Sequence, residues 1–168
     1  MPELIALERL QPSLLDRLTD DDRQNTREPL ERHVFSIRRL RESVLRDLGW
    51  LLNTTATGQP RNAEAYPEAA ASVINYGIVD LAGITSSSIE AAELARLVRE
   101  AIVRFEPRIL SESLRVEVVK EDEAMSHNTL RMQIEGEMWA VPAPLHILVN
   151  TAFDLESGRV MVTDTPAG

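Results

Sequence analysis

The second half of the chain contains three stretches in which apolar and polar residues alternate, and this pattern constrains the fold more than any other feature. The residues on the apolar side of the alternation are Leu114, Val116 and Val118, then Leu130, Met132, Ile134 and Met138, and then Leu145, Ile147, Val149, Thr151 and Phe153. A period of two places one set of side chains on each face of a strand. The alternation therefore predicts an antiparallel sheet with one covered face. A tight turn around Ser157-Gly158 leads to a short last strand, expected at Val160 to Val162.

Two earlier stretches have the period of a helix. In the first, Val34 to Leu52, the apolar residues recur every three or four positions, and turn formers follow from Asn53. The second follows a capping-box sequence at Ser87 to Glu90, and Pro107 ends it. Its apolar positions are Leu94, Leu97, Val98, Ala101, Ile102 and Phe105. We expect an α+β fold: two main helices packed on one face of a small antiparallel sheet with a C-terminal β-hairpin.

The rest of the first half is less regular. We expect residues 1–31 to form an N-terminal arm, partly disordered, and residues 32–168 to form a single α+β domain. The arm includes the short amphipathic piece PSLLDRL and the acidic run TDDDRQNTREP, and it is either ordered by a partner or a frayed terminus. Between the two helices we expect a short helix at Ala69 to Val73 and special backbone positions at Gly77 and Gly83.

Composition limits the classes of function. The chain has 27 acidic and 18 basic residues, a net charge of -9, which disfavours a phosphate-binding surface. The basic cluster of Arg38, Arg39, Arg41 and Arg46 stands among acidic residues and indicates a solvated or partner-facing side of the first helix. The chain has no cysteine, no leader-like hydrophobic segment and no run approaching the ~20 apolar residues of a membrane span. We therefore expect a soluble protein without disulfides.

The residues offer little catalytic chemistry. His33, His127 and His146 have no partners at metal-ligand spacing, and no phosphate-binding loop or nucleophile motif is present, so we expect neither a metal nor a cofactor. Glu106 is the best candidate for the general acid of a glycosidase, which needs two carboxylates. However, Arg108 stands two residues away and favours the ionised carboxylate, and no second carboxylate is singled out. Catalysis is the weaker interpretation.

The stretch FEPRI, Phe105 to Ile109, has two better interpretations. One is an internal helix stop with a local salt bridge between Glu106 and Arg108. The other is a rigid proline corner that holds a carboxylate and a guanidinium for bidentate pairing across an interface. The residues alone leave both open.

Five segments in a fixed order resemble the TssE family of type VI secretion baseplate subunits, related to phage baseplate-wedge and lysozyme-related proteins. The segments are PSLLDRLTDDD, VLRDLGWLLNT, SVINYGIVDL, FEPRI and FDLESGRV, and together they cover roughly Gln11 to Val162. The resemblance implies a non-enzymatic, cytoplasmic structural subunit of the baseplate near the inner membrane. The lysozyme name does not transfer an activity, because fold-level analogy does not establish chemistry.

The resemblance also implies partners. Glu106, Pro107 and Arg108 are expected to contact the helical core of a wedge made with TssF and TssG, beside other baseplate and tube components. The terminal hairpin, with Asp154, Gly158 and Arg159, is expected to offer an edge on which the sheath subunits TssB and TssC assemble.

Two alternatives come from other functional classes. One is a muramidase-like peptidoglycan hydrolase that uses Glu106. The other is a regulatory binding protein similar to the anti-adaptors that sequester a protease-delivery factor. Release of muropeptides would identify the hydrolase, and neighbouring genes for sheath and wedge components would favour the baseplate subunit.

Overall fold

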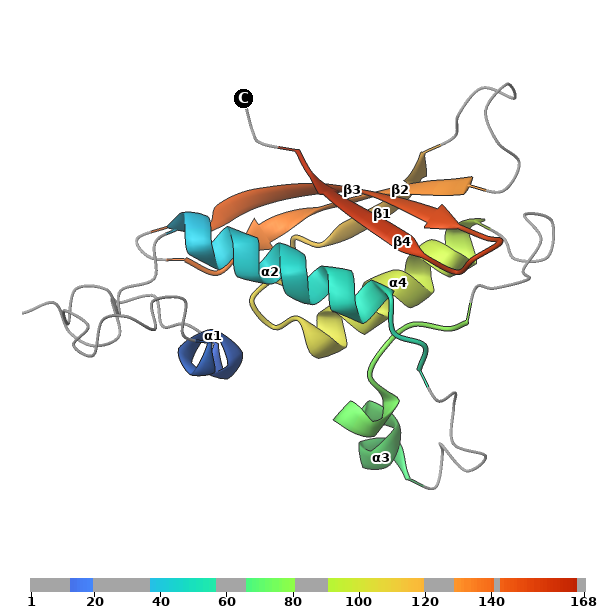
Figure 1. Cartoon of the computed structure of the whole chain (residues 1–168), viewed down its shortest axis with the longest axis horizontal. Helices are drawn as coiled ribbons and strands as arrows, with labels where there is room; N and C mark the ends of the chain where they lie inside the picture. Colours follow the sequence, from blue (N-terminus) through green and yellow to red (C-terminus); the bar gives the residue numbers. More distant parts are fainter. Residues whose placement is uncertain are drawn as a thin grey trace, which may run out of the picture.

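The computed structural model describes residues 13–19, 37–56, 66–80, 91–119, 129–140 and 143–165. Its helices are α1 (Leu14–Leu18), α2 (Ile37–Leu52), α3 (Pro67–Ala71) and α4 (Ala91–Phe105), with a short 3-10 helix, η3, at Val73–Asn75. Its strands are β1 (Arg115–Val119), β2 (Thr129–Met138), β3 (Leu145–Asp154) and β4 (Val160–Asp164). Figure 1 shows two layers, with α2 and α4 on the same side of the sheet.

The sheet confirms the strands predicted from the alternation. It is an antiparallel meander in the order β1-β2-β3-β4, and the register pairs Ile134 with both Val116 and Val149. The inward face is buried and apolar, and its fully buried side chains include Met132, Ile134, Met138, Ile147, Val149 and Phe153. The outward face is largely exposed, as one-sided alternation requires.

The two long helices cover the inward face. α2 buries Leu40, Val44, Leu48, Leu51 and Leu52, and α4 buries Leu94, Val98, Ala101 and Ile102. These side chains and those of the sheet form one core cluster, with α4 packed beside β1 and α2 beside β4. The predicted α+β architecture, including the C-terminal hairpin of β3 and β4, is therefore confirmed. Within the described ranges, no helix is long and apolar enough to cross a membrane.

The segment between the helices departs in detail from the prediction. The short helix begins at Pro67 rather than Ala69, because proline suits the first turn of a helix. It ends at Ala71 because Ser72 is extended, and η3 follows. Gly77 has the expected unusual backbone, with a φ of 125°, where residues 54–56 and 78 exchange backbone hydrogen bonds.

Some predictions lie outside the described residues. They include the capping box at Ser87 to Glu90, the position of Gly83 and most of the N-terminal arm. Of the arm, residues 13–19 are described, and they contain the expected short helix as α1. The division into an arm and a single domain stays a prediction.

Candidate functional site

The FEPRI stretch forms a tight corner at the end of α4. The amide of Glu106 still donates to the carbonyl of Ile102 at 2.8 Å, which completes the last turn of the helix. Pro107 has no amide hydrogen and cannot continue this ladder. The amide of Ile109 then donates to the carbonyl of Glu106 at 3.1 Å, so residues 106–109 close a turn. The corner redirects the chain from the helix layer to the sheet.

The Glu106 carboxylate is enclosed by this turn. The residue is only 3% exposed, although it is charged. Its Oε1 accepts from Arg108 Nε at 2.6 Å and from the Arg108 amide at 3.2 Å, and its Oε2 accepts from Arg108 Nη2 at 2.5 Å. This bidentate geometry is the strongest form of carboxylate–guanidinium pairing.

Arg108 also connects the corner to α2. Its Nη2 donates to Asp47 Oδ2 at 2.5 Å, and its Nη1 donates to Ser43 Oγ at 2.9 Å. Ser43 in turn donates to the carbonyl of Leu40 at 3.0 Å. Ser43 and Asp47 stand four residues apart and share one side of α2. Arg108 therefore binds α2 and the end of α4 to each other.

The network compensates its own charges. Burial alone would lower the pKa of Arg108, but the hydrogen bonds and charges of Glu106, followed by those of Asp47, raise that pKa above its ordinary value. Breaking a buried pair by removing one partner typically costs ~3–5 kcal/mol, because it leaves a charge uncompensated. The corner is thus a cross-tie between elements as well as a turn.

Tyr76 and Phe105 cover one side of this network. Their rings meet edge to face, with centroids 5.2 Å apart. The Tyr76 hydroxyl lies 3.5 Å from the backbone carbonyl of Asp47, at the limit of a hydrogen bond. Burial, and then the negative charges of Asp47 and Glu106, raise the pKa of Tyr76. The SVINYGIVDL and FEPRI segments therefore meet in space.

The ion pairs extend from the corner to α1. Arg46 contacts Asp47 at 2.9 Å and Asp16 of α1 at 2.5 Å, and its guanidinium lies 5.1 Å from the centroid of the Trp50 ring. Ser13 also donates to the Asp16 carboxylate, at 2.5 Å. Burial raises the pKa of Asp16, but the hydrogen bonds and charge of Arg46 and the hydrogen bonds of Ser13 together lower it by more. The net shift of this pKa is downward.

The basic cluster on α2 is paired mainly within the chain. Arg38 contacts Glu42 at 2.8 Å, Arg41 contacts Asp164 at 2.5 Å, and Arg46 belongs to the network above. This gives the cluster an intramolecular role that the sequence interpretation did not include.

The outer surface of the corner is formed by other groups. Pro107 is exposed, whereas the Arg108 side chain is 22% exposed. The carbonyl of Arg108 accepts from the amide of Trp139 at 2.7 Å, which brings the end of β2 beside the corner. Trp139 itself is 49% exposed. The charges of the motif thus face α2, and a proline and a tryptophan stand at the surface.

The predicted residues of the hairpin build its turn. Asp154 Oδ1 accepts from the amides of Glu156 and Ser157, and its Oδ2 accepts from the Ser157 hydroxyl at 2.6 Å. The hydroxyl bond and then the two amides lower the pKa of Asp154. Gly158 has a φ of 69°, which favours glycine, and Arg159 is exposed.

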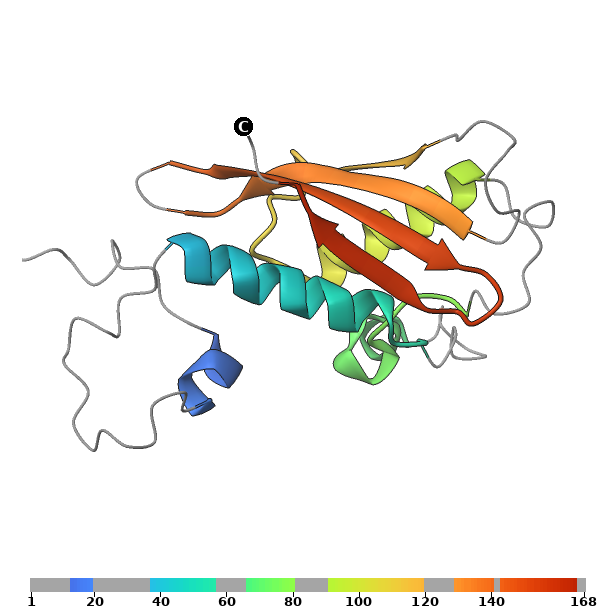
Figure 2. The same ribbon diagram turned by 45° about the horizontal axis from the view of Figure 1, so that its top comes forward.

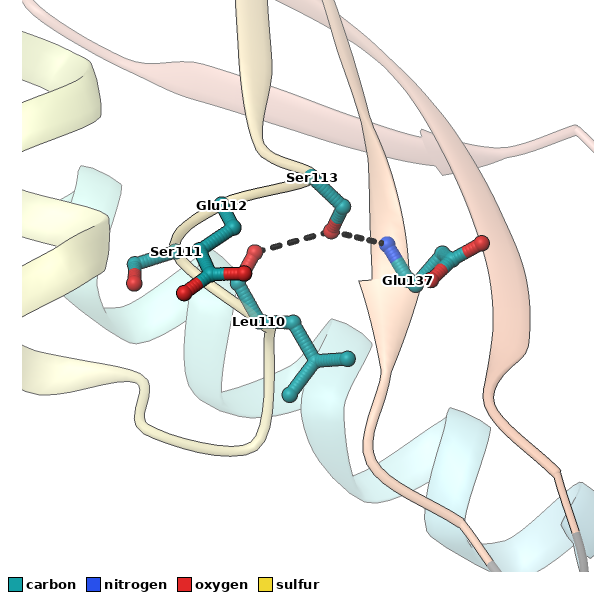
Figure 3. A pocket seen from close by; sticks show the side chains of 5 residues that line it. All are labelled: Leu110, Ser111, Glu112, Ser113 and Glu137. Atoms are coloured by element: carbon teal, nitrogen blue, oxygen red, sulfur yellow. Dashed lines mark hydrogen bonds between the residues drawn. The ribbon is translucent and has the colours of Figure 1, made fainter.

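Among the described residues, Asp47 is a carboxylate that comes close to Glu106, but both bind Arg108 Nη2 at 2.5 Å, and this shared ion pair leaves no catalytic arrangement of two free carboxylates. A pocket of about 270 Å³ lies at the turn before β1, lined by Leu110, Ser111, Glu112, Ser113 and Glu137. Figure 3 shows the carboxylates of Glu112 and Glu137 pointing in different directions, while Ser113 joins the carbonyl of Leu110 to the amide of Glu137. The Ser113 hydroxyl thus supplies an acceptor for a β2 amide just before the point where β1 begins to pair with β2. Among the described residues, no group of three or more His, Cys, Asp or Glu side chains could hold a metal ion.

The model of a family described as baseplate wedge protein gp25 matches residues 38–143, which is more than half of the chain. The chain belongs to this family. The match contains α2 from its second residue on, α4, the corner and β2, so the network joining Arg108 to α2 lies entirely within it. No curated protein and no solved structure gives a significant match. Membership of the baseplate wedge family confirms the resemblance described above and indicates a structural role in a phage-like baseplate.

Sequence reasoning singled out Glu106 and Arg108 but missed their partners on α2. Ser43 and Asp47 border the apolar stripe of that helix at a four-residue spacing. Their place at the border of the stripe was the one sequence signal that Ser43 and Asp47 face another element. It did not indicate which element that is.

Proposed function

We propose that this member of the baseplate wedge family is the TssE-type subunit of a type VI secretion baseplate, located in the cytoplasm near the inner membrane. It acts as a structural adaptor and not as an enzyme. It joins a wedge of TssF and TssG through the surface of the corner at Glu106, Pro107 and Arg108. Through the edge of its C-terminal hairpin it templates the sheath subunits TssB and TssC.

The observation that carries this proposal is that the charged side chains of the corner fix its backbone, while other side chains form its surface. Glu106 and Arg108 are tied to each other and to α2, which fixes the backbone of the turn. A rigid corner loses little conformational entropy on binding, and this favours affinity. Pro107 and Trp139 stand at its surface, and exposed tryptophan is frequent among the residues that dominate binding energy.

The enzymatic alternative is not favoured by this geometry. A general acid must reach the leaving group of its substrate. Both carboxylate oxygens of Glu106 accept from Arg108, and its side chain is 4% exposed. No observation on the described residues favours the regulatory alternative.

Co-expression with TssF and TssG from the same gene cluster, followed by size-exclusion chromatography, tests the wedge contact. We expect the native chain to co-elute with the wedge and Trp139→Ala to bind at least about tenfold more weakly, as losing an interface anchor typically does. Trp50→Ala is the matched control, because Trp50 is exposed to a similar extent, 51%, on α2. Circular dichroism verifies that each variant is folded.

A second pair of variants separates the surface of the corner from its charges. Pro107→Ala preserves the ion pairs, and Glu106→Ala/Arg108→Ala removes them. Loss of binding in the folded double variant with normal binding by Trp139→Ala would place the contact on the charges themselves. Equal co-elution of all variants would show that the wedge binds elsewhere, and no co-elution of the native chain would overturn the partner assignment.

A further inference from the structure

The outer edge of β4 is defined by the alternation of its hydrogen bonds. The amide of Asp154 donates to the carbonyl of Arg159 at 2.8 Å, and the amide of Thr165 donates to the carbonyl of Leu148 at 3.0 Å. In an antiparallel pair, every second residue bonds to the neighbouring strand and those between point their backbone groups outward. The outward residues of β4 are therefore Val160, Val162 and Asp164.

The first outward position is occupied by a side chain from the turn that follows α2. Asn53, just beyond the helix, accepts from the Val160 amide at 3.0 Å and donates to the Val160 carbonyl at 2.8 Å. An asparagine amide carries the same donor and acceptor as a peptide group. Asn53 thus takes the place that a residue of a fifth strand would occupy, and it blocks pairing at Val160.

The far end of the edge is held by a residue inside α2. Arg41 binds the Asp164 carboxylate through Nε at 2.8 Å and Nη2 at 2.5 Å, and it donates to the carbonyls of His146 and Thr165. Figure 2 shows α2 running below β4, so that one helix reaches both ends of the strand. Within the described part of the chain, nothing bonds to the outward backbone groups of Val162 and Asp164.

We propose that Asn53 and Arg41 bracket the β4 edge, Asn53 by occupying the backbone groups of Val160 and Arg41 by fixing Asp164 at the far end, so that an extended segment of another chain pairs with Val162 and Asp164. Val162 and Asp164 span roughly 7 Å along the strand. A docking site this short admits one register, because Asn53 prevents a shift toward the turn. This inference rests on the proposed sheath contact and identifies the residues that set its register.

The edge also defines the kind of segment that fits. The residue opposite Val162 must supply a backbone amide, which excludes proline. An apolar side chain is favoured there, because it would lie beside Val162, which is half-buried against the core. A second copy of the chain is disfavoured as the occupant, since each copy carries a net charge of -9. The occupant is an apolar, proline-free strand of a different protein.

Amide hydrogen exchange on the isolated chain tests the bracket. Val160 is expected to exchange at least about tenfold more slowly than Val162 and Asp164, because among the described residues only the Val160 amide is bonded at this edge. In Asn53→Ala, exchange at Val160 should become as fast as at Val162. Persistent protection of Val160 in that variant, or protection of Val162 in the native chain, would overturn the bracket.

The same measurement on a complex with the TssB–TssC pair tests the docking. Val162 and Asp164 should become protected by at least about tenfold, and Val160 should change little because Asn53 already binds it. A complex that leaves Val162 and Asp164 unprotected would overturn this inference and leave the sheath contact standing. Absence of any complex would overturn the sheath contact itself.

A matched pair of variants provides a second readout. Val162→Pro removes an outward amide without touching the ladder to β3, whereas Val162→Thr keeps the amide and the branched shape. We expect the first to bind the sheath pair at least about tenfold more weakly and the second to bind as the native chain does. Equal binding by a folded Val162→Pro would contradict the proposal. Self-association of the chain that is lost in Val162→Pro would show that a second copy is the occupant, which also contradicts it.

Discussion

At the scale of single residues, Arg108 lies where three segments of the chain meet. Its guanidinium binds Glu106 at the end of α4 and Asp47 of α2, and its carbonyl accepts from Trp139 beyond β2. One side chain and its own backbone thus connect both helices to the sheet. The charges that suggested an external hook in the sequence are used mainly inside the molecule.

Removing Glu106 should therefore lower stability. In Glu106→Ala, Arg108 keeps Asp47 but loses its bidentate partner, and we expect the free energy of unfolding to fall by about 3 kcal/mol. Urea denaturation measures this change. Glu112→Ala removes an exposed carboxylate nearby and should stay within about 0.5 kcal/mol of the native chain. A loss below 1 kcal/mol for Glu106→Ala would mean that the pair is not a stabilising cross-tie.

The Arg41–Asp164 pair predicts a pH dependence. The hydrogen bond from Arg41 is the largest influence on Asp164 and lowers its pKa. A carboxyl group with a lower pKa in the folded state stabilises the fold above its unfolded pKa, near 4, and this contribution is lost as the pH falls through the folded value. Between pH 6 and pH 3, Asp164→Asn should lose less stability than the native chain.

The control for this pH effect is Arg41→Met, which removes the cause of the shift. Between pH 6 and pH 3, Arg41→Met should also lose less stability than the native chain, because the pKa of Asp164 is no longer lowered by Arg41. At pH 6 the double variant should lose less stability than the sum of the two single losses, because each single variant already removes the shared interaction. A constant difference at every pH would indicate that Asp164 stabilises β4 by a contact other than its charge.

At the scale of elements, alanine substitutions at two glycines, one inside α2 and one packed against the residues that follow it, should have opposite effects on stability. A Cβ on Gly77 would lie 2.3 Å from the carbonyl oxygen of Thr54 and 2.8 Å from the amide of Ala56, and its φ is 125°. Gly77→Ala should cost about 3 kcal/mol, because backbone must move and the dihedral is strained. Gly49, inside α2, has open space around it, and Gly49→Ala should stabilise the chain by about 0.5–1 kcal/mol. Thermal unfolding of both variants distinguishes the outcomes, and a neutral Gly77→Ala would show that the segment adjusts freely.

Elements were also the level at which the sequence was most informative. The alternation predicted the strands and their buried face, and Pro107 predicted the end of α4. Both signals act within a few residues of the chain, so they can be read from the sequence. The pairing of Arg108 with Asp47 was not predictable, since the two lie 61 residues apart and meet only once the helices have packed. The amide bridge of Asn53 to Val160 was hidden for the same reason, and Asn53 looked like an ordinary turn former.

At the scale of the whole molecule, the family and the geometry agree on a structural role. The matched segment runs from α2 to the residues just before β3, and it contains the cross-tie that joins α2 to the end of α4. Both proposed contact surfaces lie at boundaries between layers: the corner joins α4 to the sheet, and the β4 edge is bracketed from α2. Their relative positions are therefore fixed by one core, as the proposed role of an adaptor between two assemblies requires.

An adaptor of this kind should have no hydrolytic activity of its own. Incubation of the purified chain with peptidoglycan should release no muropeptides above the buffer blank, because the Glu106 carboxylate is buried and held by Arg108. Trp139→Ala is a suitable control, since it alters the surface near the corner and leaves the network intact. Release that persists in Trp139→Ala but vanishes in Glu106→Gln would establish catalysis by Glu106. Such a result would require the corner to open and expose its carboxylate, and exchange of the Ile109 amide, which closes the turn, would then be fast.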